Sequence, residues 1–127
     1  QSLHFELGRS IVAQCGSLMT RVLYVKQSVD KQFAIVDAGM TELIRPALYG
    51  AYHHIENLTS TADKMQKYDV VGPICESSDI FAADFPLPTT QRGDILAIRS
   101  AGAYGESMAS CYNCRQLPSS YIDKEIE

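Results

Sequence analysis

The sequence predicts a small, mainly β domain that folds as a barrel or a sandwich. Short segments rich in β-branched and aromatic residues recur at intervals of roughly 8–12 residues, and Gly, Pro and Asp punctuate them. Little of the chain shows helical spacing of apolar residues. A chain of 127 residues has room for one hydrophobic core. We therefore expect a single domain over residues 1–127.

The first half of the chain predicts a hairpin followed by a short helix. Ile11-Val12-Ala13 leads into a strand over residues 18–29, Asp30-Lys31 forms the turn, and a second strand follows over residues 33–36. Over residues 41–49 the apolar spacing favours a short helical turn, and Pro46 limits its length.

The second half predicts further strands joined by polar loops. We expect extended chain over residues 51–58 and a polar loop over 59–67. Strands are expected over 68–75, broken by Gly72-Pro73, over 81–85 as an edge strand that runs into the loop Pro86-Leu87-Pro88, and over 94–99. Small residues favour a short helix over 101–112, and weak alternation favours a frayed strand over 121–127.

Charge and hydropathy exclude several classes of protein. Eleven Lys and Arg against 15 Asp and Glu give a net charge of −4, so we expect no nucleic-acid partner, because such binding depends on clustered cations. No apolar run approaches the roughly 20 residues of a membrane helix, so we expect no membrane partner. The chain begins with Gln1 rather than Met, which predicts a processed chain or part of a longer polypeptide.

The cysteines predict a reducing environment. Nothing in the sequence indicates secretion, so we expect a cytoplasmic protein whose four thiols are reduced. Cys111 and Cys114 form a Cys-x-x-Cys, but a structural zinc site needs about four ligands and a redox pair needs a thioredoxin-like setting. Neither is present nearby, so we expect no metal site and two unlinked side chains.

Two stretches in the first half carry candidate binding residues. Glu6, Gly8 and Arg9 combine an acid, a glycine that allows close approach of the backbone, and an arginine that can grip a carboxylate or phosphate. Arg45 and Tyr49 are four residues apart on the predicted helical turn and therefore share a face. Each pattern alone is also typical of an ordinary protein surface.

Two more stretches lie in the second half. Gly72-Pro73-Ile74-Cys75-Glu76 places a thiol and a carboxylate at the end of a strand, although most cysteines are inert, buried side chains. In Gly102-Ala103-Tyr104-Gly105 the glycines predict that Tyr104 projects from a loop.

Taken together, in this order and at these separations, the four stretches resemble the C-terminal region of the diaminopimelate decarboxylase family. The sharpest matches are Asp-Ala-Gly-Met followed by Ile-Arg-Pro-Ala-Leu-Tyr, Gly-Pro-Ile-Cys-Glu-Ser, and Gly-Ala-Tyr-Gly followed by Met-Ala-Ser. The resemblance extends from Glu6 to about Arg115. It implies an enzyme of lysine biosynthesis that uses pyridoxal 5'-phosphate and belongs with the alanine racemase-like and ornithine decarboxylase-like enzymes of fold type III.

The family's architecture implies that the chain is one part of a larger enzyme. An N-terminal (β/α) barrel holds the cofactor on a Schiff-base lysine, and a C-terminal, Greek-key-like β-barrel with short helical segments helps to close the site. That lysine and the glycine-rich phosphate loop are not in this chain. We therefore expect a detached C-terminal domain that is inactive alone.

The resemblance also implies a role for each candidate residue. Glu6, Gly8 and Arg9 lie beside the cofactor, with Leu7 where the family usually has proline. The substrate, meso-2,6-diaminopimelate, is contacted by Arg9, Arg45, Tyr49 and Glu76; arginines suit its carboxylates and Glu76 suits an ammonium. Tyr104 reaches both cofactor and substrate.

Cys75 is implied to be the catalytic acid. It would protonate the carbon that loses carbon dioxide, while the cofactor acts as the electron sink. In the family Cys75 and Glu76 enter the site from the partner subunit, which implies a homodimer with shared sites. Two alternatives stay open: a decarboxylase of the same fold acting on ornithine, arginine or carboxynorspermidine, and a non-catalytic β-barrel binding module.

Overall fold

A single sheet contains every strand of the computed structural model, which describes residues 1–123. The strands are β1 (Leu18–Gln27), β2 (Gln32–Val36), β3 (Ile55–Asn57), β4 (Met65–Val71), β5 (Ile80–Pro88) and β6 (Ile95–Ile98). Their order across the sheet is β3-β6-β1-β2-β4-β5. All neighbours are antiparallel except β2 and β4, which run parallel.

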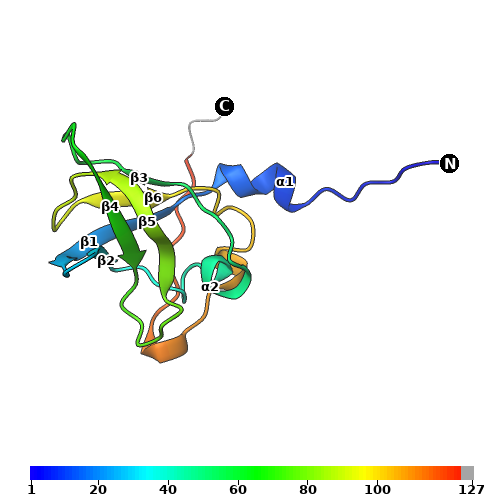
Figure 1. Ribbon diagram of the computed structural model, residues 1–127. Coiled ribbons are helices and arrows are strands. Elements are labelled where there is room, and N and C mark those ends of the chain that lie inside the picture. Colours follow the sequence, from blue (N-terminus) through cyan, green and yellow to red (C-terminus); the bar gives the residue numbers. More distant parts are fainter. Residues whose placement is uncertain (124–127) are drawn as a thin grey trace.

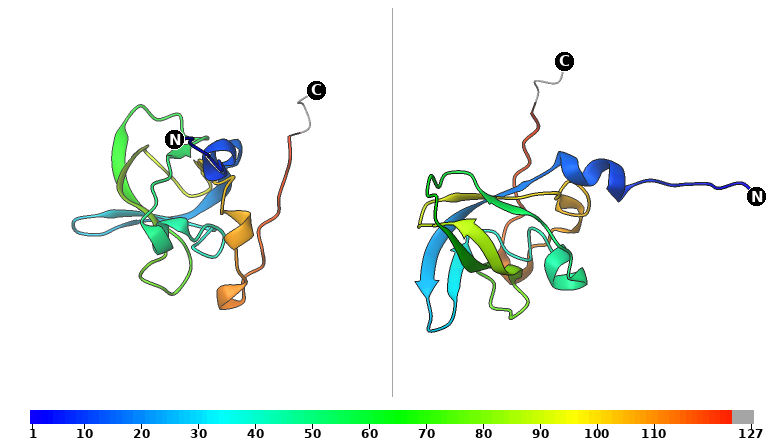
Figure 2. Two further views of the ribbon diagram at one scale, coloured as in Figure 1. Left: turned by 90° about the vertical axis from the view of Figure 1, so that its right-hand side faces the viewer. Right: turned by 45° about the horizontal axis from the view of Figure 1, so that its top comes forward.

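The sheet curls until its two edge strands approach each other (Figures 1 and 2). Side chains close the remaining gap. Asn57 Nδ2 donates to Thr90 Oγ1 at 3.1 Å, and Ser60 Oγ donates to the Thr89 carbonyl at 2.7 Å. A nearly closed, six-stranded, barrel-like sheet results, which confirms the predicted mainly β fold.

The core fills the inside of this barrel. Alternate residues of each strand point inward, as the two-residue period of a strand requires. Tyr68 is the largest of the fully buried side chains, and its hydroxyl accepts a hydrogen bond from the Thr90 amide at 3.0 Å. The rest of the core is apolar: Val22, Ala34, Val36, Ala38, Leu43, Ile55, Val70, Phe81, Phe85, Leu87, Leu96 and Ile98.

Short helices lie outside the sheet. They are α1 (Arg9–Val12), the 3₁₀ helix η1 (Ala13–Cys15), α2 (Arg45–Tyr49), and the 3₁₀ helices η2 (Glu106–Met108) and η3 (Tyr112–Cys114). Residues 1–8 form an arm that projects away from the barrel (Figures 1 and 2). Within residues 1–123 no helix has the length and apolar character that a bilayer-crossing helix requires.

The hairpin and the helix limited by Pro46 are confirmed. β1 and β2 pair antiparallel, and the amide of Ser28 donates to the carbonyl of Lys31 at 2.7 Å across the turn. Pro46 lies in the first turn of α2, and Gly50 ends the helix at φ 61°, a left-handed conformation that glycine adopts easily. β4 ends directly before Gly72, where the predicted strand over 68–75 was expected to break, but residues 73–75 do not continue it as a strand. β5 is an edge strand, as expected.

Four predictions of local structure were wrong. Pro86-Leu87-Pro88 belongs to β5 rather than to a loop, since an edge strand tolerates proline and Leu87 is buried. β4 already starts inside the predicted polar loop, at Met65. Ile11-Val12-Ala13, expected to lead into the strand as extended chain, are helical, at the end of α1 and the start of η1.

The fourth wrong prediction is the helix over residues 101–112. Only the single turn η2 forms there, because Tyr104 adopts a positive φ that interrupts any longer helix. The predicted C-terminal strand is not formed by residues 121–123, and residues 124–127 lie outside the described part of the chain.

Candidate functional site

Arg45 lies between two tyrosine rings. Its Cζ is 5.5 Å from the centroid of the Tyr49 ring and 5.8 Å from the centroid of the Tyr104 ring. The four-residue spacing within α2 places Tyr49 on the same side of the helix as Arg45. Tyr104 lies on a loop much later in the chain. Cation–π attraction favours both contacts. The structure thus brings three predicted site residues together.

The Arg45 guanidinium has no anionic partner within residues 1–123. It is not among the ion pairs of this part of the chain, and its side chain makes no hydrogen bond there. Yet the residue is only 9% exposed. Its nitrogen atoms are nevertheless not among the fully buried polar atoms that lack a partner, so the guanidinium keeps contact with solvent and is free to accept an anion as its partner. Arg45 is therefore well suited to bind an anionic group of a ligand.

A constrained loop presents Tyr104. Its φ is 58°, which non-glycine residues rarely adopt, and half of the residue is exposed. The backbone packs tightly on both sides of Tyr104, where only glycine fits. A Cβ on Gly102 would lie 2.2 Å from the Val12 carbonyl oxygen, and one on Gly105 would lie 2.4 Å from the Ala101 carbonyl oxygen. Backbone strain of this kind is concentrated at functional sites.

An open hollow of about 530 Å³ adjoins Arg45. Glu6, Gly8 and Arg9 line it from the arm and from the start of α1, and Arg45 lines it from α2. His53 is also part of the lining; its Nδ1 is 2.9 Å from the Arg99 carbonyl oxygen. Four of the predicted site residues therefore share one hollow.

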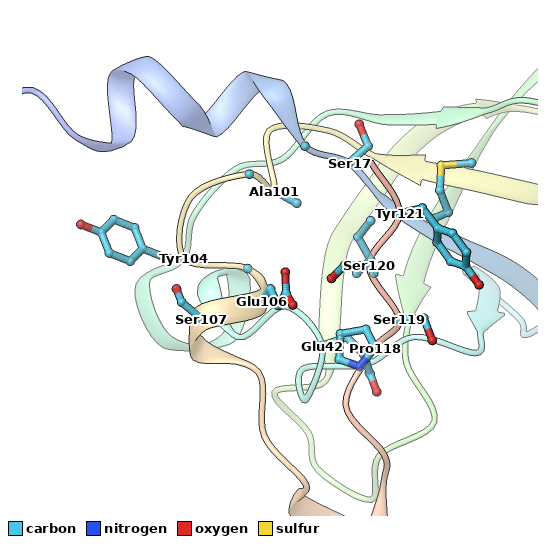
Figure 3. A pocket seen from close by; sticks show the side chains of 15 residues that line it. Ser17, Glu42, Ala101, Tyr104, Glu106, Ser107, Pro118, Ser119, Ser120 and Tyr121 are labelled. Atoms are coloured by element: carbon cyan, nitrogen blue, oxygen red, sulfur yellow. The ribbon is translucent and has the colours of Figure 1, made fainter. Parts of the chain in front are cut away.

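A second hollow, of about 770 Å³, lies between the loop that carries Tyr104 and residues 118–121 (Figure 3). The Tyr104 ring points away from it, toward the side of Arg45, while Glu106 lies near its centre. Glu106 and Ser120 were not predicted as site residues, and no motif in the sequence marks them. Arg45 and Tyr49 do not line this space, and Tyr104 is the one residue of the Arg45 cluster that does.

Cys75 and Glu76 lie on the loop of residues 72–79 between β4 and β5. Both are exposed, so Cys75 is not the buried, inert side chain that is usual for cysteine. Glu76 Oε1 accepts a hydrogen bond from the Tyr112 hydroxyl at 2.5 Å. This hydrogen bond and the nearby negative charge raise the pKa of Tyr112 above its ordinary value of 10.0.

Asp79 holds this loop in place. Its carboxylate is 3% exposed and accepts from the amides of Met40 at 2.6 Å and Ile74 at 2.7 Å. Burial raises the pKa of Asp79, and the two amide donors counter that rise. A Cβ on Gly72 would meet an Asp79 oxygen at 2.3 Å, and one on Gly39 would meet an Asp79 oxygen at 3.1 Å. The two glycines are what allow the carboxylate to fit.

A second carboxylate fixes the segment that carries Tyr112. Buried Glu42 accepts from the amide of Gly39 at 2.7 Å and from Arg115 Nε at 3.0 Å. Arg115 Nη2 also donates to the Asp37 carbonyl at 2.5 Å. Asp79, Glu42, Tyr112 and Arg115 were not predicted as site residues.

The predicted site residues thus fall into two groups. One surrounds Arg45, and the other is the pair Cys75 and Glu76. Among the described residues no hydrogen bond, ion pair or ring contact joins the two groups. The four cysteines are all free and exposed, and residues 1–123 contain no cluster of three or more His, Cys, Asp or Glu that could hold a metal ion.

Comparison with known proteins identifies the family. Residues 10–102 match the family described as pyridoxal-dependent decarboxylase, C-terminal sheet domain. The chain belongs to this family. The match spans β1 to β6 and includes Arg45, Tyr49, Cys75 and Glu76.

Close relatives carry one name. The chain is 64% identical over 126 residues to diaminopimelate decarboxylase of Bacteroides thetaiotaomicron, and the alignment covers 99% of this chain and 32% of that protein. It is 54% identical over 111 residues to the Helicobacter pylori enzyme of the same name, and this alignment covers 87% of this chain and 27% of that protein. The chain therefore spans about a third or less of the length of these curated relatives.

Solved structures agree with the fold. Diaminopimelate decarboxylase from Helicobacter pylori complexed with L-lysine superposes with a TM-score of 0.81 at 52% identity, covering 88% of this chain and 28% of that one. The diaminopimelate decarboxylase of M. jannaschii in co-complex with L-lysine gives a TM-score of 0.84 at 43% identity, covering 87% of this chain and 25% of that one.

Proposed function

We propose that this chain is the C-terminal β-barrel domain of a two-domain decarboxylase that converts meso-2,6-diaminopimelate to L-lysine and carbon dioxide. The relatives at 64% and 54% identity bear that name, and two structural relatives were solved with L-lysine, the product of this reaction. The observation that carries the proposal is the unpaired Arg45 guanidinium between Tyr49 and Tyr104.

Arg45 favours this substrate over other amino acids of similar size. Diaminopimelate has a carboxylate at each end, whereas ornithine and arginine have one. A guanidinium is a planar fork of N–H donors whose geometry suits a bidentate carboxylate. A substrate with a second carboxylate is therefore the best match for Arg45. A non-catalytic binding module would not require a thiol and a carboxylate side by side on an exposed loop.

The residues around the first hollow fit the edge of a pyridoxal 5'-phosphate site. Glu6, Gly8 and Arg9 line it together with Arg45, and the half-exposed Tyr104 ring is near enough to Arg45 to face the same ligand. When bound, the cofactor would serve as the electron sink of the decarboxylation. The lysine that holds it belongs, in this proposal, to the preceding (β/α) barrel of the whole protein.

In this proposal, Cys75 supplies the proton. Its Sγ is on the surface, where a substrate carbon can approach it, and thiols are mostly protonated at neutral pH. Glu76, next to it, has the charge to bind the substrate ammonium. Because these two residues make no contact with the Arg45 cluster in one chain, we propose that they complete the site of a partner subunit in a homodimer. Four unpaired, exposed thiols are typical of a reducing compartment, so we also propose a cytoplasmic location.

A chimera tests the activity. The C-terminal 32% of the Bacteroides thetaiotaomicron enzyme is replaced by this chain, and carbon dioxide release from meso-2,6-diaminopimelate is measured. We expect a working decarboxylase, and no turnover by the 127-residue chain alone. Cys75→Ala should lower kcat roughly 10²–10⁴-fold, as expected for loss of a positioned acid, whereas Cys15→Ala should have no effect. A chimera that prefers ornithine or arginine would contradict the proposed substrate.

Subunit complementation tests the shared site. The Cys75→Ala and Arg45→Ala chimeras, each nearly inactive, are co-expressed with different affinity tags and purified as a mixture. If a site takes Arg45 from one subunit and Cys75 from the other, half of the dimers are mixed and each has one intact site. About a quarter of the wild-type activity should then return, from simple statistics of a two-fold dimer. No recovery would mean that both residues act within one chain.

A further inference from the structure

We propose that Tyr112 is a positioning residue that fixes the Glu76 carboxylate for binding of the substrate ammonium. This inference deepens the proposed function and rests on it. Its basis is the short hydrogen bond between the Tyr112 hydroxyl and Glu76 Oε1.

Without a partner, an exposed glutamate on a loop would sample several rotamers. Ordering such a side chain at the moment of binding costs free energy and weakens affinity. A phenol donating to one carboxylate oxygen removes that cost in advance. Glu76 Oε2 makes no hydrogen bond within residues 1–123, so it is left to face a cation.

The segment that carries Tyr112 is anchored independently of Glu76. The side chain of Arg115 binds buried Glu42 and the carbonyl of Asp37. On the other side of Tyr112, the amide of Ser110 donates to the carbonyl of Thr41 at 2.9 Å. Both anchors lie in the stretch of residues 37–42.

The loop that carries Glu76 is anchored to the same stretch. Asp79 binds the amide of Met40, and the same carboxylate binds the amide of Ile74 within the loop. Residues 37–42 therefore hold both partners of the Tyr112–Glu76 hydrogen bond. The fold sets the separation of the two side chains, and this is why we assign Tyr112 a role beyond that of a surface residue in chance contact.

Tyr112→Phe in the chimera removes only the hydroxyl. We expect KM for meso-2,6-diaminopimelate to rise about three- to tenfold, the net worth of one typical hydrogen bond, with kcat changed less than about twofold. Tyr24→Phe is the matched control, since Tyr24 is an exposed tyrosine on β1, and it should match the wild type. An unchanged KM, or a fall in kcat at constant KM, would overturn the inference.

A double-mutant cycle separates positioning from general stability. In a Glu76→Gln background the loss of the Tyr112 hydroxyl should raise KM by a much smaller factor than it does in the wild type. Equal factors in both backgrounds would show that Tyr112 acts without Glu76.

A titration of the ring reports on the same contact without activity. With ¹³C-labelled tyrosine, the Tyr112 phenol should titrate above its ordinary pKa of 10.0 in the wild type and closer to it in Glu76→Gln. Identical titration curves would overturn the inference whether or not the chimera is a decarboxylase. Absence of carbon dioxide release with a shifted Tyr112 titration would instead reject the proposed function alone.

Discussion

Replacing Asp79 by alanine should destabilise the fold by removing the hydrogen bonds that hold the loop with Cys75 and Glu76. The carboxylate is the acceptor for the half-buried amide of Met40 at 2.6 Å and for the buried amide of Ile74 at 2.7 Å. A buried donor left without an acceptor costs about 1–3 kcal/mol, so two orphaned amides give about 2–6 kcal/mol. Burial raises the pKa of Asp79, which means that its ionised form is itself disfavoured in the fold. Part of the loss is therefore offset, and we expect a net loss of about 2–4 kcal/mol.

Urea denaturation of the chain, followed by circular dichroism, measures this loss. Asp79→Asn keeps one acceptor oxygen and should fall between alanine and wild type. Asp63→Ala is the control, because Asp63 is exposed in the loop before β4, and it should stay within about 0.5 kcal/mol of the wild type. Amide exchange should also quicken at Met40 and Ile74 in the alanine variant. A loss below about 1 kcal/mol would refute the reasoning, since it would mean that both amides find other partners.

Three further results are expected. Gly72→Ala should cost about 1–3 kcal/mol in the same denaturation assay, because its Cβ would lie 2.3 Å from an Asp79 oxygen; an unchanged midpoint would contradict the packing. For Asp69, burial opposes ionisation, but the Lys31 hydrogen bond and a backbone donor outweigh it and hold the pKa below 3.8. Its stabilising effect is thus present above pH 3.8 and is lost as the pH falls through the lower folded pKa, so Asp69→Asn should flatten the acid side of a stability–pH curve. Arg45→Lys should raise KM of the chimera about tenfold, since an ammonium cannot bind a carboxylate bidentately, and an equal KM would contradict a guanidinium–carboxylate contact.

Features that depend on neighbours in sequence were predictable. The spacing of Arg45 and Tyr49 on one helical turn predicted that they share a face, and the structure confirms their contact. The glycines around Tyr104 predicted that its side chain projects from a loop. The β1–β2 hairpin follows from β-branched segments on either side of a polar turn. Each of these local structures is determined by residues that lie within a few positions of one another, so the sequence pattern is enough to predict it.

Features that depend on residues far apart in the sequence could not be predicted. The Tyr112–Glu76 hydrogen bond spans 36 residues, the Met40–Asp79 hydrogen bond 39, and the Arg115–Glu42 hydrogen bond 73. No local pattern marks these side chains as partners, because an acid, a tyrosine or an arginine in a loop is usually solvated. Pro86 and Pro88 were assigned to a loop for a related reason: only the sheet order shows that β5 is an edge where proline costs little.

The projecting arm has a practical consequence for work with the separated domain. Leu3, Phe5 and Leu7 are 83%, 75% and 63% exposed, so in the separated domain their apolar surface faces water unless another molecule covers it. In concentrated samples the domain should self-associate through this arm and light scattering should rise with concentration. Trimming residues 1–8 would give better-behaved material for NMR and crystallisation, although Glu6 and Gly8 would be removed with it.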